Sequence, residues 1–309
     1  MKYRALGRTG IQVSELSFGG SSLGGAFGEV TQVAADEAVG MALDAGINLF
    51  DTSPHYGVTR AETVLGTALR NRPRDSYYLS TKCGQYGPGN FDFSPERVTR
   101  SVDESLQRLR TDHVDLLFCH DIEFVDIQPI ITETLPALFK LKEQGKARFI
   151  GVSGFPLKIF PTVLDQIDLD VILAYCHYTL QNQRLNALIP YLREKGVGIV
   201  SAAPLGMRLL SNKPLPDWHP AQPEIREAMT QARLFCESKG VDIAQLALEF
   251  ALETGQADTT LLGIATPDEV ERNLRGLSSS ISTEIRAEVL QILEPVRDRV
   301  WHSGKAENN

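Results

Sequence analysis

Four residues of types that move protons stand at or just after the ends of short apolar runs. Asp51, Lys82 and His120 each follow such a run, and Tyr56 lies in the turn after Asp51. A free tyrosine has a pKa of about 10, and a cation held a few ångströms away lowers that value. Lys82 could be that cation, Asp51 could keep it charged, and His120 could hydrogen-bond a reacting oxygen. The set predicts proton transfer by Tyr56, with a pKa below its usual value, beside a hydride transfer.

Each of these residues alone also has an ordinary structural explanation. A single Asp at a strand end is usually a turn former, a Lys there is usually a solvated charge, and a lone His is more often structural than catalytic. Lys82 and Asp51 could also form a purely structural ion pair. All four at consecutive strand ends are harder to explain in this way, so we interpret them as one site.

The elements that must position this site alternate between short apolar runs and longer runs with helical spacing. Nearly continuous apolar character is typical of parallel strands that are covered on both faces. The expected strands span residues 16–18, 47–50, 77–80, 114–119, 149–152, 171–175, 198–202 and 260–263. Strand–helix units in this number predict an α/β fold, a (β/α)8 TIM barrel, whose chemistry sits at the C-terminal ends of the strands.

Further segments add to these units. Ser94 followed by Pro95 is a helix-start signal. The sequence also predicts an N-terminal β-hairpin over 3–13, two extra helices over 242–253 and 281–295, and a long loop over 203–222. No obvious linker interrupts the pattern, so we expect a single barrel domain over residues 1–309.

A doubly wound open sheet is the alternative fold, and it would normally bind a dinucleotide through Gly-x-Gly-x-x-Gly after the first strand. The sequence contains no such string, and it contains no Walker-type Gly-x-x-x-x-Gly-Lys. The glycines that follow the first strand, Gly19 and Gly20 with Gly24 and Gly25, are interpreted as a loop that lets a ligand approach the backbone.

Composition and charge argue against several function classes. The 309 residues include 31 Lys and Arg against 39 Asp and Glu, a formal net charge of −8, which argues against nucleic-acid binding. No apolar run reaches the roughly 18 residues of a membrane span, and the N-terminus lacks an apolar signal segment. The 4 Cys include no Cys-x-x-Cys pair, so we expect free thiols in a reducing, cytoplasmic compartment. We also expect a monomer or small homo-oligomer. We expect no metal site, because Lys82 would repel a metal held by Cys83, Cys119 and Cys176.

Taken together, the motifs resemble those of the aldo-keto reductase family. The resembling strings are, in chain order, Asp51-x4-Tyr56-Gly57, Glu62-x2-Leu65-Gly66, Ser80-Thr81-Lys82, His120, Gly151-Val152-Ser153 and Ala203-Pro204-Leu205. This resemblance implies a barrel that binds a nicotinamide dinucleotide without a Rossmann motif. It also implies that Tyr56 is the general acid and base, with Asp51, Lys82 and His120 as its partners.

The resemblance and the strand-end positions together predict the cofactor contacts. These are Gly19, Gly20, Asp51, Ser153, Tyr175, Ser201, Ala202, Pro204, Leu205, Gly263, Ile264, Ala265, Thr266, Glu269 and Asn273. Two positions depart from the family pattern. Gly154 stands where relatives often have an Asn that helps to hold the carboxamide, and Ala202 stands where an aromatic ring often stacks on the nicotinamide.

The segment after the last strand bears on NAD against NADP. Barrel phosphate sites commonly form after strands seven and eight, at a helix N-terminus. Relatives that use NADPH often have Lys, Ser and Arg where this chain has Gly263, Ile264 and Glu269. Glu269 would repel a 2′-phosphate and could accept a hydrogen bond from a ribose hydroxyl, although Arg272 could partly offset it. We therefore expect NAD to be preferred over NADP.

Further strings narrow the resemblance within the family: Ser80-Thr81-Lys82-Cys83-Gly84, Cys119-His120-Asp121-Ile122-Glu123-Phe124, Pro156-Leu157-Lys158-Ile159-Phe160, Tyr175-Cys176-His177-Tyr178 and Trp218-His219-Pro220. They resemble those of plant-type L-galactose dehydrogenases, which oxidise a sugar at C1 to the lactone with NAD. The expected substrate contacts are His55, Tyr56, His120, Asp121, Glu123, Phe124 and Trp218. Carboxylates accept hydrogen bonds from hydroxyls, so Asp121 and Glu123 favour a polyol over an apolar aldehyde. We expect L-galactose or a related sugar such as L-fucose as the substrate.

Two other functions remain open at this point. One is a carbonyl reductase that uses NADPH and acts on aldehydes or ketones. The other is a non-enzymatic, cofactor-sensing subunit built on the same barrel. The complete set of four proton-moving residues favours the enzyme.

Overall fold

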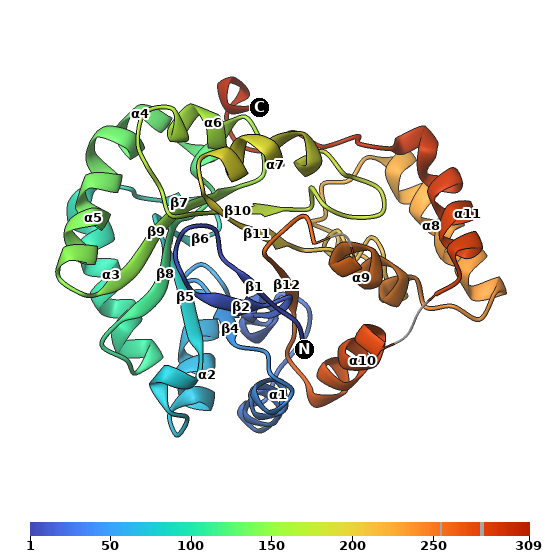
Figure 1. Ribbon diagram of the computed structural model, residues 1–309, viewed down its shortest axis with the longest axis horizontal. Coiled ribbons are helices and arrows are strands. Elements are labelled where there is room, and N and C mark those ends of the chain that lie inside the picture. The colour runs from blue at the N-terminus through green and yellow to red at the C-terminus, as the bar shows by residue number, and fades with distance from the viewer. Residues whose placement is uncertain (254, 279–280) are drawn as a thin grey trace.

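A computed structural model describes residues 1–253, 255–278 and 281–309 of the chain. In this part, parallel strands form a closed barrel in the order β10-β11-β12-β3-β4-β5-β8-β9 (Figure 1). The strands are β3 (Leu16–Gly19), β4 (Leu49–Asp51), β5 (Tyr78–Cys83), β8 (Val114–Cys119), β9 (Ala147–Gly154), β10 (Val171–Tyr175), β11 (Gly198–Ala202) and β12 (Thr259–Gly263). Each expected strand overlaps one of these, so the predicted (β/α)8 barrel is confirmed.

The inside of the barrel is a packed core, and a hairpin closes one end of it. Branched and aromatic side chains fill the interior, among them Leu49, Leu116, Phe118, Val171, Leu173, Val200 and Leu261. The hairpin strands β1 (Tyr3–Ala5) and β2 (Gln12–Ser14) confirm the predicted hairpin. Leu6, Ile11 and Val13 of this hairpin pack against the interior cluster, so ligands must use the opposite end.

The barrel closes where its last strand pairs with its first. Thr260 lies opposite Leu16 in the register of β12 and β3, and Gly263 lies opposite Gly19. Beyond the ladder, the Thr260 N–H donates to the Glu15 oxygen at 2.9 Å, and the Ile264 N–H donates to the Gly19 oxygen at 3.1 Å. This edge brings the segment after β12 beside the glycine loop after β3.

Helices cover the outside of the barrel (Figure 1). They are α1 (Gln32–Asp44), α2 (Arg60–Leu69), α3 (Pro95–Leu109), α4 (Ile127–Pro129), α5 (Leu135–Glu143), α6 (Ile159–Leu164), α7 (Leu185–Glu194), α8 (Pro223–Ser238), α9 (Ile243–Glu253), α10 (Pro267–Ser278) and α11 (Thr283–Leu293). Ser94 caps α3 as predicted, because its hydroxyl oxygen accepts the Arg97 N–H at 3.4 Å. The extra helices expected over 242–253 and 281–295 correspond to α9 and α11, whereas α8 was not predicted.

The segments at the end of the barrel opposite the hairpin include two long connections and segment 301–309. The short hairpin β6 (Gln85–Gly87) with β7 (Asn90–Phe91) follows β5, and the predicted loop 203–222 follows β11. Segment 301–309 returns to the loop after β8, where Lys305 donates its N–H to the oxygen of Glu123. Within the described ranges, no helix is both long and apolar enough to cross a membrane.

Candidate active site

The strand register brings the four proton-moving residues to one end of the barrel. Asp51 ends β4 and lies opposite Ser80 on β5, while Lys82 and Cys83 end β5 beside Phe118 and Cys119 of β8. His120 directly follows β8, and its N–H donates to the Cys83 oxygen at 2.9 Å. Side chains from three neighbouring strands therefore meet at the end that the hairpin leaves open.

Lys82 and Asp51 form a buried ion pair. The Lys82 Nζ lies 2.6 Å from Asp51 Oδ1 and donates to the Thr52 backbone oxygen at 2.8 Å. Both side chains are almost inaccessible, at 1% and 4% exposure. Burial alone would lower the pKa of Lys82, but Asp51 and the Tyr56 oxygen outweigh it, and the pKa is raised. Lys82 is therefore a permanent cation in the site.

Tyr56 is partly buried beside that cation. The Lys82 Nζ lies 4.9 Å from the centre of the Tyr56 ring. Burial raises the pKa of Tyr56 to about 12, because loss of solvation exceeds the opposite effect of Lys82 and the Asp51 charge adds to it. The expectation of a pKa below its usual value is therefore wrong for the protein alone, although Lys82 acts in the expected direction.

His120 is held next to Tyr56 as a neutral imidazole. Its Nδ1 lies 2.9 Å from the Ser53 hydroxyl, and its ring centre lies 5.5 Å from that of Tyr56, at an interplanar angle of 89°. Burial, then Lys82, lowers the pKa of His120 well below its usual value. The Nε2 atom lies 3.9 Å from Asp121 Oδ1, so an oxygen of a ligand could be bound between Tyr56, His120 and Asp121.

Polar groups form one side of this space. Asp121 has a left-handed backbone (φ 50°) and donates its N–H to the Ser153 hydroxyl at 3.2 Å. Burial, then the nearby Glu123, raises the pKa of Asp121 well above its usual value. His55 lies 5.6 Å from His120 between ring centres, and among the described residues its buried Nδ1 has no hydrogen-bond partner. Glu123 differs from Asp121, because its side chain is fully enclosed.

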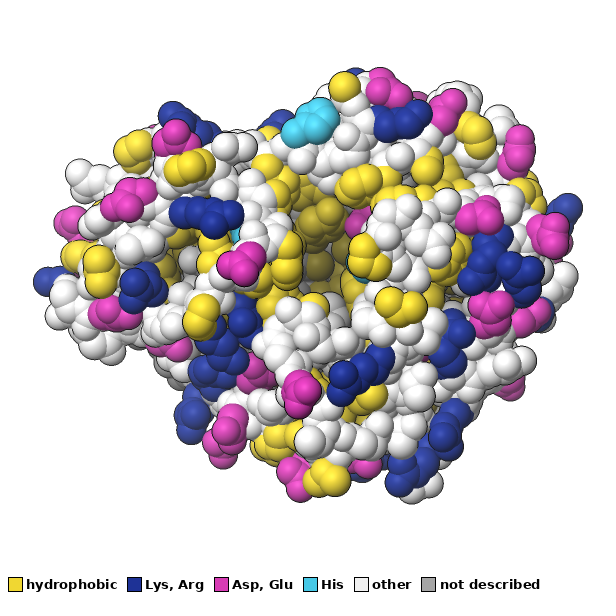
Figure 2. Space-filling view, turned by 180° about the vertical axis from the view of Figure 1, so that it is seen from behind, with side chains coloured by type: hydrophobic (Ala, Val, Ile, Leu, Met, Phe, Trp, Pro, Cys, Tyr) yellow, Lys and Arg dark blue, Asp and Glu magenta, His cyan; other side chains and the backbone are white. Residues whose placement is uncertain are grey.

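Two aromatic rings, Phe124 and Trp218, stand in the loops after β8 and β11 at the same end of the barrel. Phe124 stacks on Phe91 with 4.8 Å between ring centres, and Trp218 lies 6.0 Å from Phe27. Phe124 and Trp218 are among the exposed large side chains, at 39% and 55%. The face opposite the hairpin is hollowed at its centre, and hydrophobic side chains surround the hollow (Figure 2). Polar groups and aromatic rings at one end of the barrel suit a sugar, whose ring has both polar and apolar surface.

The predicted nicotinamide contacts lie on the strand ends around the same space. Ser153 is near the end of β9, Tyr175 ends β10, and Ser201 has a buried hydroxyl without a partner among the described residues. A Cβ at Gly154 would lie only 2.5 Å from Glu123 Oε2. The Glu123 carboxylate thus occupies the space that an Asn side chain at position 154 would need.

The other predicted cofactor residues lie at or after the ends of β11, β12 and β3, which are neighbours in the barrel. They are Gly19, Gly20, Ala202, Pro204, Leu205, Gly263, Ile264, Ala265 and Thr266, with Asn273 partly buried on α10. A Cβ at Gly20 would lie 2.6 Å from the Asp51 backbone oxygen, so the chain needs glycine there. Glu269 accepts the Ala265 N–H at 2.9 Å.

The loop 203–222 adds two cations that the sequence pattern does not predict. The Lys213 Nζ lies 2.8 Å from Glu269 Oε1. Arg208 donates to the Phe27 oxygen at 2.6 Å, and its guanidinium lies 4.7 Å from the Phe27 ring centre. The charge of Glu269 is therefore paired with that of Lys213. Nothing in the local sequence indicates this pairing, since the two residues lie 56 positions apart.

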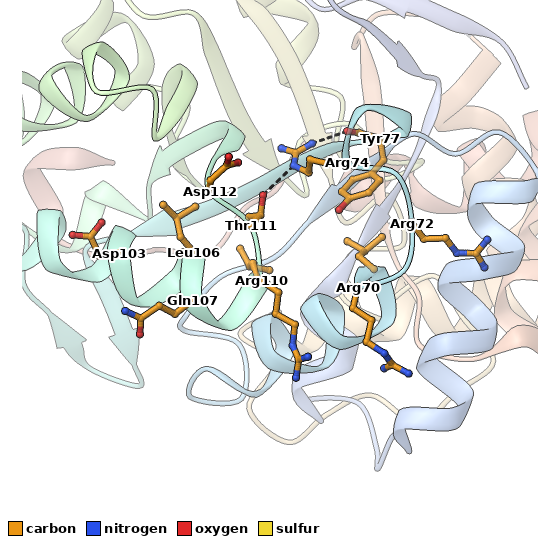
Figure 3. Close-up of a pocket in the computed structure, with 12 residues that line it drawn as sticks. Arg70, Arg72, Arg74, Tyr77, Asp103, Leu106, Gln107, Arg110, Thr111 and Asp112 are labelled. Atoms are coloured by element: carbon orange, nitrogen blue, oxygen red, sulfur yellow. Dashed lines mark hydrogen bonds between the residues drawn. The ribbon is translucent and has the colours of Figure 1, made fainter.

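A cavity of about 880 Å³ lies elsewhere, between the ends of α2 and α3, and is lined by Arg70, Arg72, Arg74, Arg110 and other residues (Figure 3). It borders Tyr77 and Thr111, which precede β5 and β8, so it lies at the hairpin end of the barrel. Arg74 already donates to Thr111 Oγ1 at 3.2 Å, to the Tyr77 oxygen at 2.9 Å and to Asp115 at 2.7 Å. This cavity contains none of the predicted site residues, and we do not assign the chemistry to it.

No group of three or more His, Cys, Asp or Glu side chains in the described residues is placed to hold a metal ion. The cysteines Cys83, Cys119, Cys176 and Cys236 are free and buried. Burial also raises the pKa of Cys176.

Comparisons with known proteins agree with this geometry. The aldo/keto reductase family profile matches residues 15–294. L-Galactose dehydrogenase of Arabidopsis thaliana is 47% identical over 317 residues, covering 100% of this chain and 99% of the relative. D-Arabinose 1-dehydrogenase of Saccharomyces cerevisiae is 34% identical and covers 84% of this chain and 81% of the relative. The structure of an aldo-keto reductase from Bacillus halodurans, in its holo form, superimposes with a TM-score of 0.80 at 28% identity, covering 98% of this chain and 99% of that one. The chain therefore belongs to the aldo/keto reductase family.

Proposed function

We propose that this protein oxidises an aldose at C1 to the lactone with NAD, and that the sugar is L-galactose or a related one such as L-fucose. The observation that carries the proposal is the buried Lys82–Asp51 pair beside Tyr56 and His120. The similarity to L-galactose dehydrogenase over the whole chain, and to D-arabinose 1-dehydrogenase, supports an aldose as the substrate.

The residues present fit a nicotinamide dinucleotide. The Ser201 hydroxyl is buried near the end of β11 and has no hydrogen-bond partner among the described residues, and Gly19 and Gly20 lie at the end of β3, two strands further around the barrel. When bound there, the nicotinamide ring would accept a hydride from C1 of the sugar. Ser153, held by Asp121, would help to orient the carboxamide.

The chain's own residues would manage the proton. As the C1–H leaves as hydride, the C1–OH proton would pass to the ionised Tyr56 oxygen, and the C1–O bond would become a carbonyl. Lys82 favours ionised Tyr56, and neutral His120 could hydrogen-bond the reacting oxygen. Asp121 would accept hydrogen bonds from neighbouring hydroxyls, which an apolar aldehyde lacks.

A panel of aldoses and simple aromatic aldehydes, assayed with both cofactors in both directions, tests the function. We expect the highest kcat/KM for L-galactose or L-fucose with NAD. A higher efficiency with aromatic aldehydes and NADPH would instead indicate a carbonyl reductase. Nucleotide binding without turnover of any member of the panel would indicate a cofactor-sensing protein.

The preference for NAD gives a second prediction, at Glu269. We expect wild-type kcat/KM to be higher with NAD than with NADP, and we expect Glu269→Arg to shift the ratio toward NADP by about tenfold or more, equivalent to about 1.4 kcal/mol. Lys213→Ala should shift the ratio the other way, because it leaves the charge of Glu269 unpaired.

The matched control for this prediction is Glu271→Arg, on the same helix. Glu271 is 62% exposed and pairs only loosely with Arg275, at 3.5 Å. The cofactor ratio of this variant should stay at the wild-type value. A wild-type enzyme that works equally well or better with NADP would contradict the assignment to Glu269.

A further inference from the structure

Segment 301–309 makes several hydrogen bonds to Glu123, in the loop that follows β8. The backbone oxygen of Glu123 accepts the Lys305 N–H at 2.9 Å and the Asn308 side-chain amide at 2.9 Å. The Ser303 hydroxyl donates to Glu123 Oε1 at 3.0 Å. Asn308 also donates to the Val125 oxygen at 2.9 Å. Three residues of the segment thus make their contacts with Glu123 and the residue two positions after it.

The Glu123 side chain connects this segment to the barrel. It is fully buried, and the same Oε1 also accepts the N–H of Phe155, directly after β9, at 3.1 Å. The absence of a side chain at Gly154 leaves the room that the carboxylate occupies. Trp301, at the start of the segment, stacks on Phe155 with 4.8 Å between ring centres. The Glu123 Oε1 atom therefore links the loop both to the segment and to the residue that follows β9.

The loop that these contacts hold in place contains Asp121, one of the polar residues of the site. Asp121 stands two positions before Glu123, and only a short helical turn, Ile122–Phe124, follows it. The Asp121 carboxylate is partly exposed and lies 3.9 Å from the His120 Nε2. Because its left-handed backbone conformation is unfavourable for a residue with a side chain, the surroundings must hold Asp121 in place.

We propose that Glu123 is a positioning residue, which does not touch the sugar but fixes loop 121–125 to segment 301–309 and so sets where Asp121 meets the sugar hydroxyls. The inference rests on the proposed function for the identity of the ligand. It replaces the expected role of Glu123 as a direct substrate contact. An interaction made equally in the bound substrate and in the transition state changes KM and leaves kcat in place.

Gly304→Ala tests this without changing any functional group. Gly304 has φ +71°, and a Cβ there would lie 2.3 Å from the Glu123 oxygen, so the segment must move away. We expect the KM for L-galactose to rise by about tenfold, the size of a lost hydrogen bond to a charged group, with kcat and the Kd for NAD little changed. Amide hydrogen exchange in residues 121–125 should become faster.

Two further variants and a control sharpen the test. Ser303→Ala removes one hydroxyl and should raise the sugar KM in the same direction but by less, and it replaces Gly304→Ala if that variant does not fold. Glu123→Gln keeps the shape and an acceptor oxygen, so it should retain more affinity for the sugar than Glu123→Ala. Lys305→Ala is the control, because only its backbone N–H contacts Glu123 and its side chain pairs with exposed Glu307.

The outcomes separate this inference from the proposed function. Unchanged sugar KM and unchanged exchange in folded Gly304→Ala or Ser303→Ala would overturn the positioning role while aldose oxidation stands. A rise in sugar KM matched by an equal rise in the Kd for NAD would also overturn it, since the effect would then be general. If the wild-type protein oxidises no aldose, the proposed function fails, and the exchange rates alone decide whether Glu123 fixes the loop.

Discussion

Replacement of Tyr56 by Phe should lower the turnover number for sugar oxidation at least about 100-fold, the lower end of acid–base catalysis. The change removes the hydroxyl that lies beside Lys82 and His120 and keeps the ring that packs against them. Steady-state kcat at saturating NAD and sugar measures the effect, and a fluorescence titration should give an unchanged Kd for NAD.

Tyr78→Phe is the matched control for this prediction. Tyr78 begins β5, at the opposite end of the strand from Lys82, and it is partly buried like Tyr56. Its loss of a hydroxyl should leave turnover near the wild-type value. Near-normal turnover in Tyr56→Phe itself would show that another group exchanges the proton.

Lys82→Met should reduce both stability and activity strongly. The substitution leaves the Asp51 carboxylate buried without its cation, and breaking such a pair typically costs about 3–5 kcal/mol. Ser80 still donates to Asp51, so the loss should fall at the lower end of that range. Urea unfolding measures the free energy of unfolding. The rate of oxidation at neutral pH should fall by more than the loss of folded protein accounts for, because Tyr56 loses the charge that favours its ionised form.

The pH profile of kcat/KM separates the two effects of Lys82. In the proposed mechanism oxidation requires ionised Tyr56, and the pKa of this residue, about 12, lies above the working range. The ionised fraction therefore increases with pH, and the rate of the wild-type enzyme should rise from pH 6 to pH 9. Without Lys82 the pKa of Tyr56 rises further, so the variant should be slower at every pH in that range.

Lys142→Met provides the control for the loss of an ion pair. Lys142 lies 2.6 Å from Asp170, the same distance as in the Lys82–Asp51 pair, but its side chain is 35% exposed. This variant should lose little stability, because exposed pairs contribute at most about 1 kcal/mol, and its pH profile should match that of the wild type. A flat wild-type profile would remove the argument for Tyr56, unless product release limits the rate.

The barrel could be predicted from the sequence because its strands are buried on both faces. Such strands are short apolar runs whose first and last residues can be recognised in the sequence. The runs over 114–119, 171–175 and 198–202 match β8, β10 and β11 residue for residue. The grouping of Asp51, Lys82 and His120 follows from the same signal, since parallel strands all end at one edge.

The contacts that escaped prediction join distant positions without any periodic pattern. The Ser303–Glu123 bond links residues 180 positions apart, and no local feature of either residue indicates it. The pKa of Tyr56 was mispredicted for a related reason. The cation expected at a neighbouring strand end, Lys82, suggests a lowered pKa, whereas the opposing effect of burial depends on every element packed around the ring.

The pairing of β12 with β3 also bears on how the protein is made. During synthesis from the N-terminus, Asp51, Tyr56, Lys82 and His120 leave the ribosome well before residues 259–263, which complete the barrel. Until then the growing sheet has two unpaired edges, which are templates for association with other chains. Nascent chains are therefore most vulnerable to aggregation in this interval. A fragment that ends before Thr259 would contain all four residues, yet it should be inactive and should need a chaperone to stay in solution.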